Sequence, residues 1–244
     1  MIPLRTSVTQ QQVPWVNHVL IGANLALFAY ELALGPQVEN FVQTYGWVPA
    51  TFSQALEQGT VPPLSPLLFC MFLHGSWAHL LGNLLYLYIF GGNVEDRLGH
   101  LRYLIFYSVG GMIAVLVQTY TNPTSTLPMI GASGAIAAVT GAYFVFCPTA
   151  RVLTLLPLGF SFPVIRIPAV FYLVLWLGLQ VGAGMHAQAA TTTPVVEVAW
   201  WAHVGGFIGG LLLGPLLLLK RRHPRRRRST SSLAWHNPRS ALRW

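Results

Sequence analysis

The stretch WWAHVGGFIGGLLLGPLLLL, residues 200–219, decides the class of protein. It is 20 residues long and carries one ionisable side chain, that of His203. About 20 apolar residues are what an α-helix needs to cross a bilayer. The segment that follows, 220–228, holds seven of the fourteen Lys and Arg residues of the chain. Because basic residues gather on the cytoplasmic side of a span, the stretch predicts a transmembrane helix with its end in the cytoplasm.

The composition also indicates a membrane protein. Of 244 residues, 54% are hydrophobic and only 8% are charged, whereas soluble domains are about one quarter charged. The length suits a single membrane domain, 16–219, between a cytoplasmic segment, 1–15, and a basic cytoplasmic tail, 220–244. The net charge of +8 is concentrated in that tail. We therefore expect contacts with membrane lipids and no nucleic-acid partner.

Six apolar runs predict an all-α polytopic membrane protein, a bundle of six transmembrane helices. The runs are 16–34, 78–94, 101–119, 133–147, 167–182 and 200–219. Lys and Arg are absent from the alternate loops 35–77, 120–132 and 183–199. This asymmetry predicts an integral protein of the cell (inner or plasma) membrane with both termini in the cytoplasm. Residues 1–17 show no signal-peptide pattern, so we expect the first run to remain in the mature protein.

The first outer loop, 35–77, is long and more apolar than a solvated loop should be. It contains Phe41, Tyr45, Trp47, Phe52 and Leu56. Short amphipathic helices lying in the outer membrane interface would account for this composition. Elsewhere, Cys70 and Cys147 lie in apolar segments, which favours reduced core residues over a disulfide.

Polar side chains recur at one depth in three of the runs. His79 and Asn83 are four residues apart and share one helix face. Counted from the cytoplasmic side at about 1.5 Å per residue, Ser133 and Asn83 lie about 21 Å up, His203 about 26 Å and His79 about 27 Å. Ionisable or polar groups inside a membrane are costly, so they are candidates for function.

Two ridges of small residues offer a way for Ser133 and His203 to meet. They are Ser133, Ala137 and Gly141 in the fourth run, and Gly206, Gly210 and Gly214, below His203, in the sixth. Such faces let two helix backbones approach closely. Histidine is the usual base that activates a serine hydroxyl, so the two side chains form a candidate catalytic dyad. The alternative is that these polar residues only pack the helices together, as Ser and Gly often do in membranes.

The surroundings of Ser133 favour the catalytic interpretation. Its N–H group lies at the expected start of a helix, where developing negative charge is favoured. His79 and Asn83 can add donors to complete an oxyanion hole. The second, fourth and sixth runs hold no Asp or Glu at this depth, which excludes an acidic third member from them. His79, Asn83 and His203 lack a nearby carboxylate to support a metal, so we expect no metal and no cofactor.

Three motifs, in this order, resemble the signatures of the rhomboid family of intramembrane serine proteases. They are His74-x4-His79-x3-Asn83, Gly131-Ala-Ser133-Gly134 and Ala202-His203-x2-Gly206-x3-Gly210. The resemblance covers roughly residues 15–220. It implies that Ser133 is the nucleophile and His203 its base, that His79 and Asn83 stabilise the oxyanion, and that the substrates are transmembrane proteins.

The resemblance also implies structural roles for several residues, and it shows one departure from the family pattern, at Ala137. The expected structural residues are His74, Gly131, Gly134, Glu95, Arg97, Gly206 and Gly210. Members of the family often carry an aromatic residue one turn after the serine, where it stacks on the catalytic histidine. This chain has Ala137 there, so His203 is either held by another group or positioned less firmly. We interpret the aromatic residues of the fifth run, Trp176 among them, as lipid-facing or core residues.

Two other functions remain open. A non-catalytic rhomboid-like protein would bind membrane clients without cutting them, but such relatives lose the serine or the histidine, and this chain keeps both. A small transporter would carry charges within the membrane or inverted repeats, and we expect neither.

Overall fold

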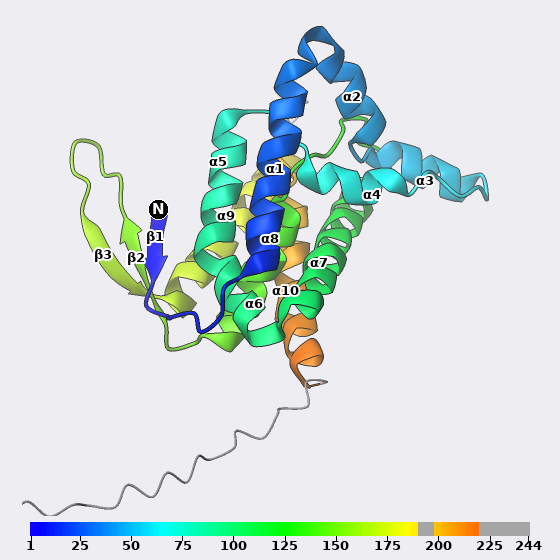
Figure 1. Ribbon diagram of the computed structural model, residues 1–244. Helices are drawn as coiled ribbons and strands as arrows, with labels where there is room; N and C mark the ends of the chain where they lie inside the picture. Colours follow the sequence, from blue (N-terminus) through cyan, green and yellow to red (C-terminus); the bar gives the residue numbers. More distant parts are fainter. Residues whose placement is uncertain (190–197, 220–244) are drawn as a thin grey trace, which may run out of the picture.

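The computed structural model describes residues 1–189 and 198–219. The long helices are α1 (Trp15–Ala33), α7 (His100–Thr121), α8 (Ser133–Phe146), α9 (Ala169–Ala189) and α10 (Trp200–Leu219). A sixth long helix consists of α5 (Trp77–Tyr86), a π-helical turn (Leu87–Gly91) and α6 (Gly92–Leu98). Figure 1 shows these helices bundled together, with short helices at one end and a small sheet on one flank. The basic tail and Glu197 lie outside the described residues.

Four of these helices are long and apolar enough to cross a membrane: α1, α7, α9 and α10. A fifth span results if the helix Trp77–Leu98 is joined with the segment Ser65–Phe72, from which it is bent by 92°. The fourth predicted span corresponds to α8, which has only 14 residues. The protein is therefore mostly helical with four to five candidate spans, and the count of six stays a prediction.

Helix α8 is short because it is enclosed by other helices. Every residue from Gly134 to Tyr143 is buried. On one side a Cβ atom at Gly110 of α7 would collide with Ala138, and on the other side α10 lies against the α8 backbone. A helix shielded in this way does not have to match the thickness of the bilayer along its own length.

The contact between α8 and α10 is made by backbone against backbone. A Cβ atom added at Gly206 would collide with the carbonyl oxygen of Gly134, and one at Gly210 with that of Ala138. From the α8 side, a Cβ atom added at Gly141 would collide with the carbonyl oxygen of Phe207 in α10. Small residues at these positions are what let membrane helices approach so closely.

Glu95 fixes the start of α1. Its carboxylate is buried and accepts the N–H groups of Val16 at 3.0 Å and Asn17 at 2.7 Å. It also pairs with the ring of His100. A carboxylate at a helix N-terminus satisfies free N–H groups and complements the helix dipole. Arg97, which the sequence pairs with Glu95, lies two residues further along the same helix, α6.

The expectation of an all-α protein is wrong in one part. An antiparallel sheet in the order β1–β2–β3 joins β1 (Ile2–Thr6), β2 (Arg151–Leu155) and β3 (Val164–Pro168). These segments are rich in β-branched residues, which favour strands. The fifth predicted run began at Ile167, but α9 begins only at Ala169. Pro168 accounts for the difference, because the residue before a proline is driven towards extended backbone.

Short elements occupy the segment between α1 and α5. They are a 3₁₀ turn (Gly35–Gln37), α2 (Val38–Tyr45), α3 (Pro49–Glu57), α4 (Ser65–Phe69) and a second 3₁₀ turn (Cys70–Phe72). Trp47 ties this segment to the bundle, because its indole N–H donates to Thr119 of α7 at 2.8 Å. The position of these helices at a membrane interface stays a prediction.

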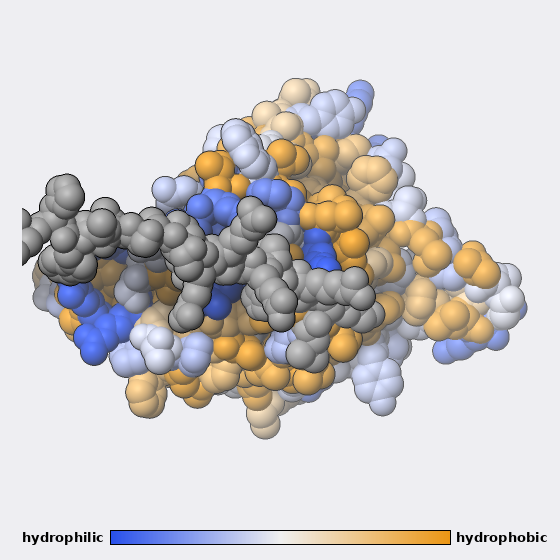
Figure 2. Space-filling model, turned by 60° about the horizontal axis from the view of Figure 1, so that its bottom comes forward, coloured by the Kyte–Doolittle hydropathy of each residue, from blue (hydrophilic) through white to orange (hydrophobic). Residues whose placement is uncertain are grey.

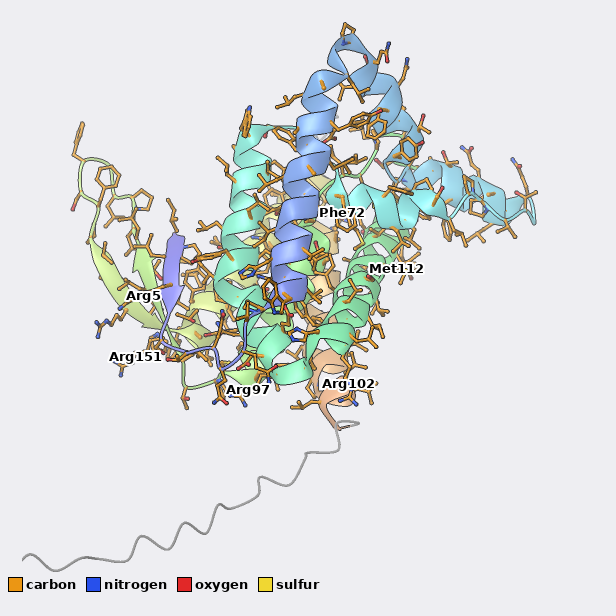
Figure 3. All side chains as sticks on the ribbon, in the orientation of Figure 1. Arg5, Phe72, Arg97, Arg102, Met112 and Arg151 are labelled. Atoms are coloured by element: carbon orange, nitrogen blue, oxygen red, sulfur yellow. The ribbon has the colours of Figure 1, made fainter. Side chains whose placement is uncertain are left out.

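Positive charge gathers at the end of the bundle where α1 begins. Arg5, Arg97, Arg102 and Arg151 all lie towards that end in Figure 3. Seen from this end, hydrophilic side chains are grouped on the face and hydrophobic ones cover much of the remainder (Figure 2). The arginines that the charge pattern assigned to one side of a membrane thus lie at one end of the molecule.

Replacing Gly210 with alanine is expected to lower the free energy of unfolding by about 3 kcal/mol, because the new methyl group must push α8 and α10 apart. Thermal unfolding in detergent micelles measures the loss. Gly22→Ala in α1 is the matched control, since a Cβ atom there meets nothing within 4 Å. Equal Tm values for the two variants would contradict the packing of α8 on α10.

Candidate functional site

Ser133 lies at the first residue of α8, and a tight turn delivers it there. Gly131 has a φ of +122°, a conformation that side chains rarely allow. Its N–H group donates to the carbonyl oxygen of Cys70 at 2.8 Å, which anchors the turn. The first N–H groups of any helix have no partner within the helix. The hydroxyl of Ser133 therefore lies beside a group of donors that can bind an anion.

Ser133 and His203 are in direct contact. The Oγ atom of Ser133 lies 2.8 Å from the Nε2 atom of His203, across the boundary between α8 and α10. The backbones touch at Gly134, the residue after Ser133, and at Gly206, one turn after His203, so the two side chains come within reach. A hydroxyl in this position can give its proton to the imidazole when its oxygen forms a new bond.

The other side of the His203 ring is held by α9. The Nδ1 atom of His203 lies 2.7 Å from the Oε1 atom of Gln180. The Trp176 ring, one turn earlier in α9, is tilted by 40° to the imidazole with ring centroids 6.1 Å apart. Trp176 packs against the core, as one of its two sequence interpretations has it, and it is also a neighbour of His203. Among the described residues, these contacts from α9 support the His203 ring.

His74, His79 and Asn83 form a second group around the turn at Gly131. A Cβ atom at Gly131 would lie 2.5 Å from Nε2 of His79 and 3.7 Å from Nδ2 of Asn83. The Nδ1 atom of His74 is 3.1 Å from the carbonyl oxygen of Phe72, which can only accept. Nδ1 therefore carries the proton, and Nε2 of His74 accepts from Nδ2 of Asn83 at 3.0 Å. His74 thereby fixes the orientation of the Asn83 amide.

Two polar residues that the sequence did not single out support these groups. Glu31 of α1 is buried, and its carboxylate accepts the N–H group of His74 at 3.1 Å. Gln180 is the buried amide that holds His203. Both are polar residues inside apolar runs, a signal that could have identified them. Glu31 lies inside the first predicted run, 16–34, although the prediction from the sequence is that no charges lie within the membrane.

These side chains face a common cavity of about 810 Å³. Its lining comes from α5, α8, α9 and α10 and from the segment that precedes Gly131. Ser133, His203, His79, Asn83 and Gln180 all contribute to its wall. A cavity of this size with a few polar groups in an apolar lining is the usual form of a ligand or substrate site. Within residues 1–189 and 198–219, no group of three or more His, Cys, Asp or Glu side chains is arranged to hold a metal ion.

The fold and the site define a polytopic membrane protein with a serine, a histidine and amide donors around one cavity. The Rhomboid domain family matches residues 63–220, and the chain belongs to this family. It is 31% identical to the rhomboid protease GlpG of Haemophilus influenzae over 144 residues, which are 58% of this chain and 64% of that protein.

Two plant proteins are similar over different lengths. RHOMBOID-like protein 5 of Arabidopsis thaliana is 29% identical over 148 residues, 61% of this chain and 42% of that protein. RHOMBOID-like protein 1 of the same plant is 24% identical over 224 residues, 82% of this chain and 52% of that protein. The chain thus spans less than two thirds of the length of each of these relatives.

Gly131→Ala is expected to destabilise the protein more than Gly159→Ala. Both glycines have a positive φ, so each variant carries strain of about 1–3 kcal/mol. Only at Gly131 does the methyl group also press on the His79 ring, because a Cβ atom at Gly159 meets nothing within 4 Å. Thermal unfolding of both variants measures the difference, to which the less favourable φ at Gly131 also contributes. A Tm for Gly131→Ala at or above that of Gly159→Ala would show that His79 does not pack on the turn.

Proposed function

We propose that this protein is an intramembrane serine endopeptidase that hydrolyses peptide bonds of transmembrane protein substrates. The observation that carries the proposal is the contact of 2.8 Å between Ser133 Oγ and His203 Nε2 in the wall of the cavity. Membership of the Rhomboid family, and similarity to a protein named as a rhomboid protease, support the same chemistry.

Acylation needs a base on one side of the serine and an anion site on the other. His203 takes the Ser133 proton at Nε2 while Oγ bonds to the carbonyl carbon of the substrate. The carbonyl oxygen becomes an oxyanion, for which the Ser133 N–H, the Asn83 amide and the His79 ring are the donors. The C–N bond then breaks, and His203 passes its proton to the leaving amine.

Deacylation repeats these steps with water. His203 removes a proton from water, whose oxygen attacks the acyl-Ser133 ester, and the same donors bind the second oxyanion. The C–O bond to Ser133 then breaks, and the serine recovers its proton from His203. Asn83 is set up for this role because His74 holds one of its N–H groups and leaves the other free to turn towards the cavity.

In this proposal six helices of the domain 16–219 cross the cell membrane, with α8 as the short, enclosed one. Both termini lie in the cytoplasm, and α2, α3 and α4 lie in the outer interface. The arginines at the end where α1 begins support this orientation. Ser133 and His79 lie near the N-terminal ends of α8 and α5, which are the outer ends in this orientation. Water would therefore reach the site from the outer side.

A fluorophosphonate probe, which reacts with activated serines, tests the proposal. The wild type in detergent or liposomes should be labelled and Ser133→Ala should not. His203→Ala should react at least ~100-fold more slowly, because the general base is gone. The variant Ser161→Ala, at an exposed serine between β2 and β3, should react like the wild type.

The same experiment separates the proposal from its main alternative, a rhomboid-like protein that binds membrane clients without cutting them. Labelling of wild type and Ser133→Ala to the same extent would contradict the proposal. So would a folded wild type that the probe does not label, and that result would favour client binding.

A further inference from the structure

Gln180 is a buried amide in the middle of an apolar helix. It lies in α9, one of the candidate spans, and its side chain is 9% exposed. Exposed apolar residues surround it along that helix, among them Val174, Leu175 and Leu179. A polar group in such a place costs free energy unless its donors and acceptors find partners. Its partner is the imidazole that Ser133 also contacts, on the opposite ring nitrogen.

The two contacts of the ring determine where its proton lies. The Oε1 atom of Gln180 carries no hydrogen, so at 2.7 Å it can only accept from the Nδ1–H group of His203. A neutral imidazole has one N–H group, which leaves Nε2 with a free lone pair. Nε2 is the atom 2.8 Å from Ser133 Oγ, so it accepts the hydroxyl hydrogen. This tautomer is the one that a general base requires.

The amide must also be held the right way round. If its NH₂ group faced Nδ1, the ring proton would move to Nε2, and His203 could not take a proton from Ser133. The backbone carbonyl oxygen of Trp176, one turn earlier in α9, accepts from the NH₂ group of Gln180 at 3.4 Å. Although this bond is long, its direction favours Oε1 on the His203 side. The Trp176 ring lies beside the imidazole on the same face of α9.

We propose that Gln180 is a positioning residue that fixes the tautomer and orientation of His203, completing a Ser133–His203–Gln180 arrangement in which a neutral amide takes the third place. The proposal rests on the proposed function, since it concerns the base of that reaction. The described groups that face His203 from other elements are Ser133 of α8 and His79 of α5. Ser133 occupies Nε2, and the hydrogen bond at Nδ1 is the one to Gln180.

A merely structural role for Gln180 makes a different prediction. If the amide only filled space, removing it would lower stability and leave the reaction rate of the folded protein unchanged. As a positioning residue it acts on the proton transfer, so its loss lowers kcat and leaves KM nearly unchanged. A replacement that keeps an acceptor oxygen at the same distance should then restore the rate.

The kinetic test compares Gln180→Leu, Gln180→Glu and Asn24→Leu with the wild type. For Gln180→Leu we expect kcat for cleavage of a transmembrane substrate, and the rate of fluorophosphonate labelling, to fall on the order of 10- to 100-fold with KM within about 3-fold. Gln180→Glu, which keeps an acceptor, should recover kcat to within about 5-fold of wild type. Asn24 is a buried amide of α1 that bonds to its own helix at Leu20, so Asn24→Leu controls for the loss of a buried amide and should keep kcat.

The outcomes of this test are distinct. A Gln180→Leu variant with wild-type kcat would overturn the role of Gln180 while leaving the protease proposal intact. A Gln180→Glu variant as slow as Gln180→Leu would also overturn it, because the acceptor would then not matter. A wild type that neither cleaves nor reacts with the probe would refute the protease proposal itself.

A second measurement does not depend on activity or on the folding of Gln180→Leu. In ¹⁵N-histidine-labelled wild type, the two ring nitrogens of His203, identified by their loss in His203→Ala, report the tautomer directly. We expect a protonated Nδ1 and an unprotonated Nε2. A proton on Nε2 would overturn the proposal whatever the activity of the protein.

Discussion

The close approach of α8 and α10 is the contact on which the rest of the structure depends. Glycines at 206 and 210 bring the α10 backbone against the carbonyl oxygens of Gly134 and Ala138, and Gly141 does the same from the α8 side. No larger residue fits at these points without separating the helices. Because Ser133 directly precedes Gly134 and His203 lies one turn before Gly206, the distance between Ser133 Oγ and His203 Nε2 depends on this backbone packing. The site is therefore as rigid as the core that carries it.

The polar groups of the site are supported from two helices that contribute no motif. On one side, Glu31 of α1 binds the backbone of His74, and the His74 ring orients Asn83. On the other, Gln180 of α9 binds the ring that faces Ser133. In a membrane interior an unpaired polar group is costly, and Asn83 and His203 each have such a partner. The same partners that satisfy these groups also select their orientation and tautomer.

The sequence predicts the helical membrane class and the group of Ser133, His203, His79 and Asn83 because hydropathy, motif order and depth along a helix are local properties. It misses the three-stranded sheet, whose segments of five residues lie outside the predicted runs except for the last two residues of β3. It also misses Gln180, although the absence of an aromatic residue at Ala137 leaves open which group, if any, supports His203. Which face of α9 turns towards α10 depends on packing between helices, and a single sequence does not encode that rotation in any local pattern.

The central claim is that Ser133 cuts other membrane proteins. It is tested most directly by reconstituting the wild type and Ser133→Ala into liposomes with a single-span model substrate and reading the products by mass spectrometry. The account predicts a cut in or near the outer part of the substrate's transmembrane segment with the wild type, and intact substrate with Ser133→Ala. The same products formed at the same rate by both proteins would contradict it.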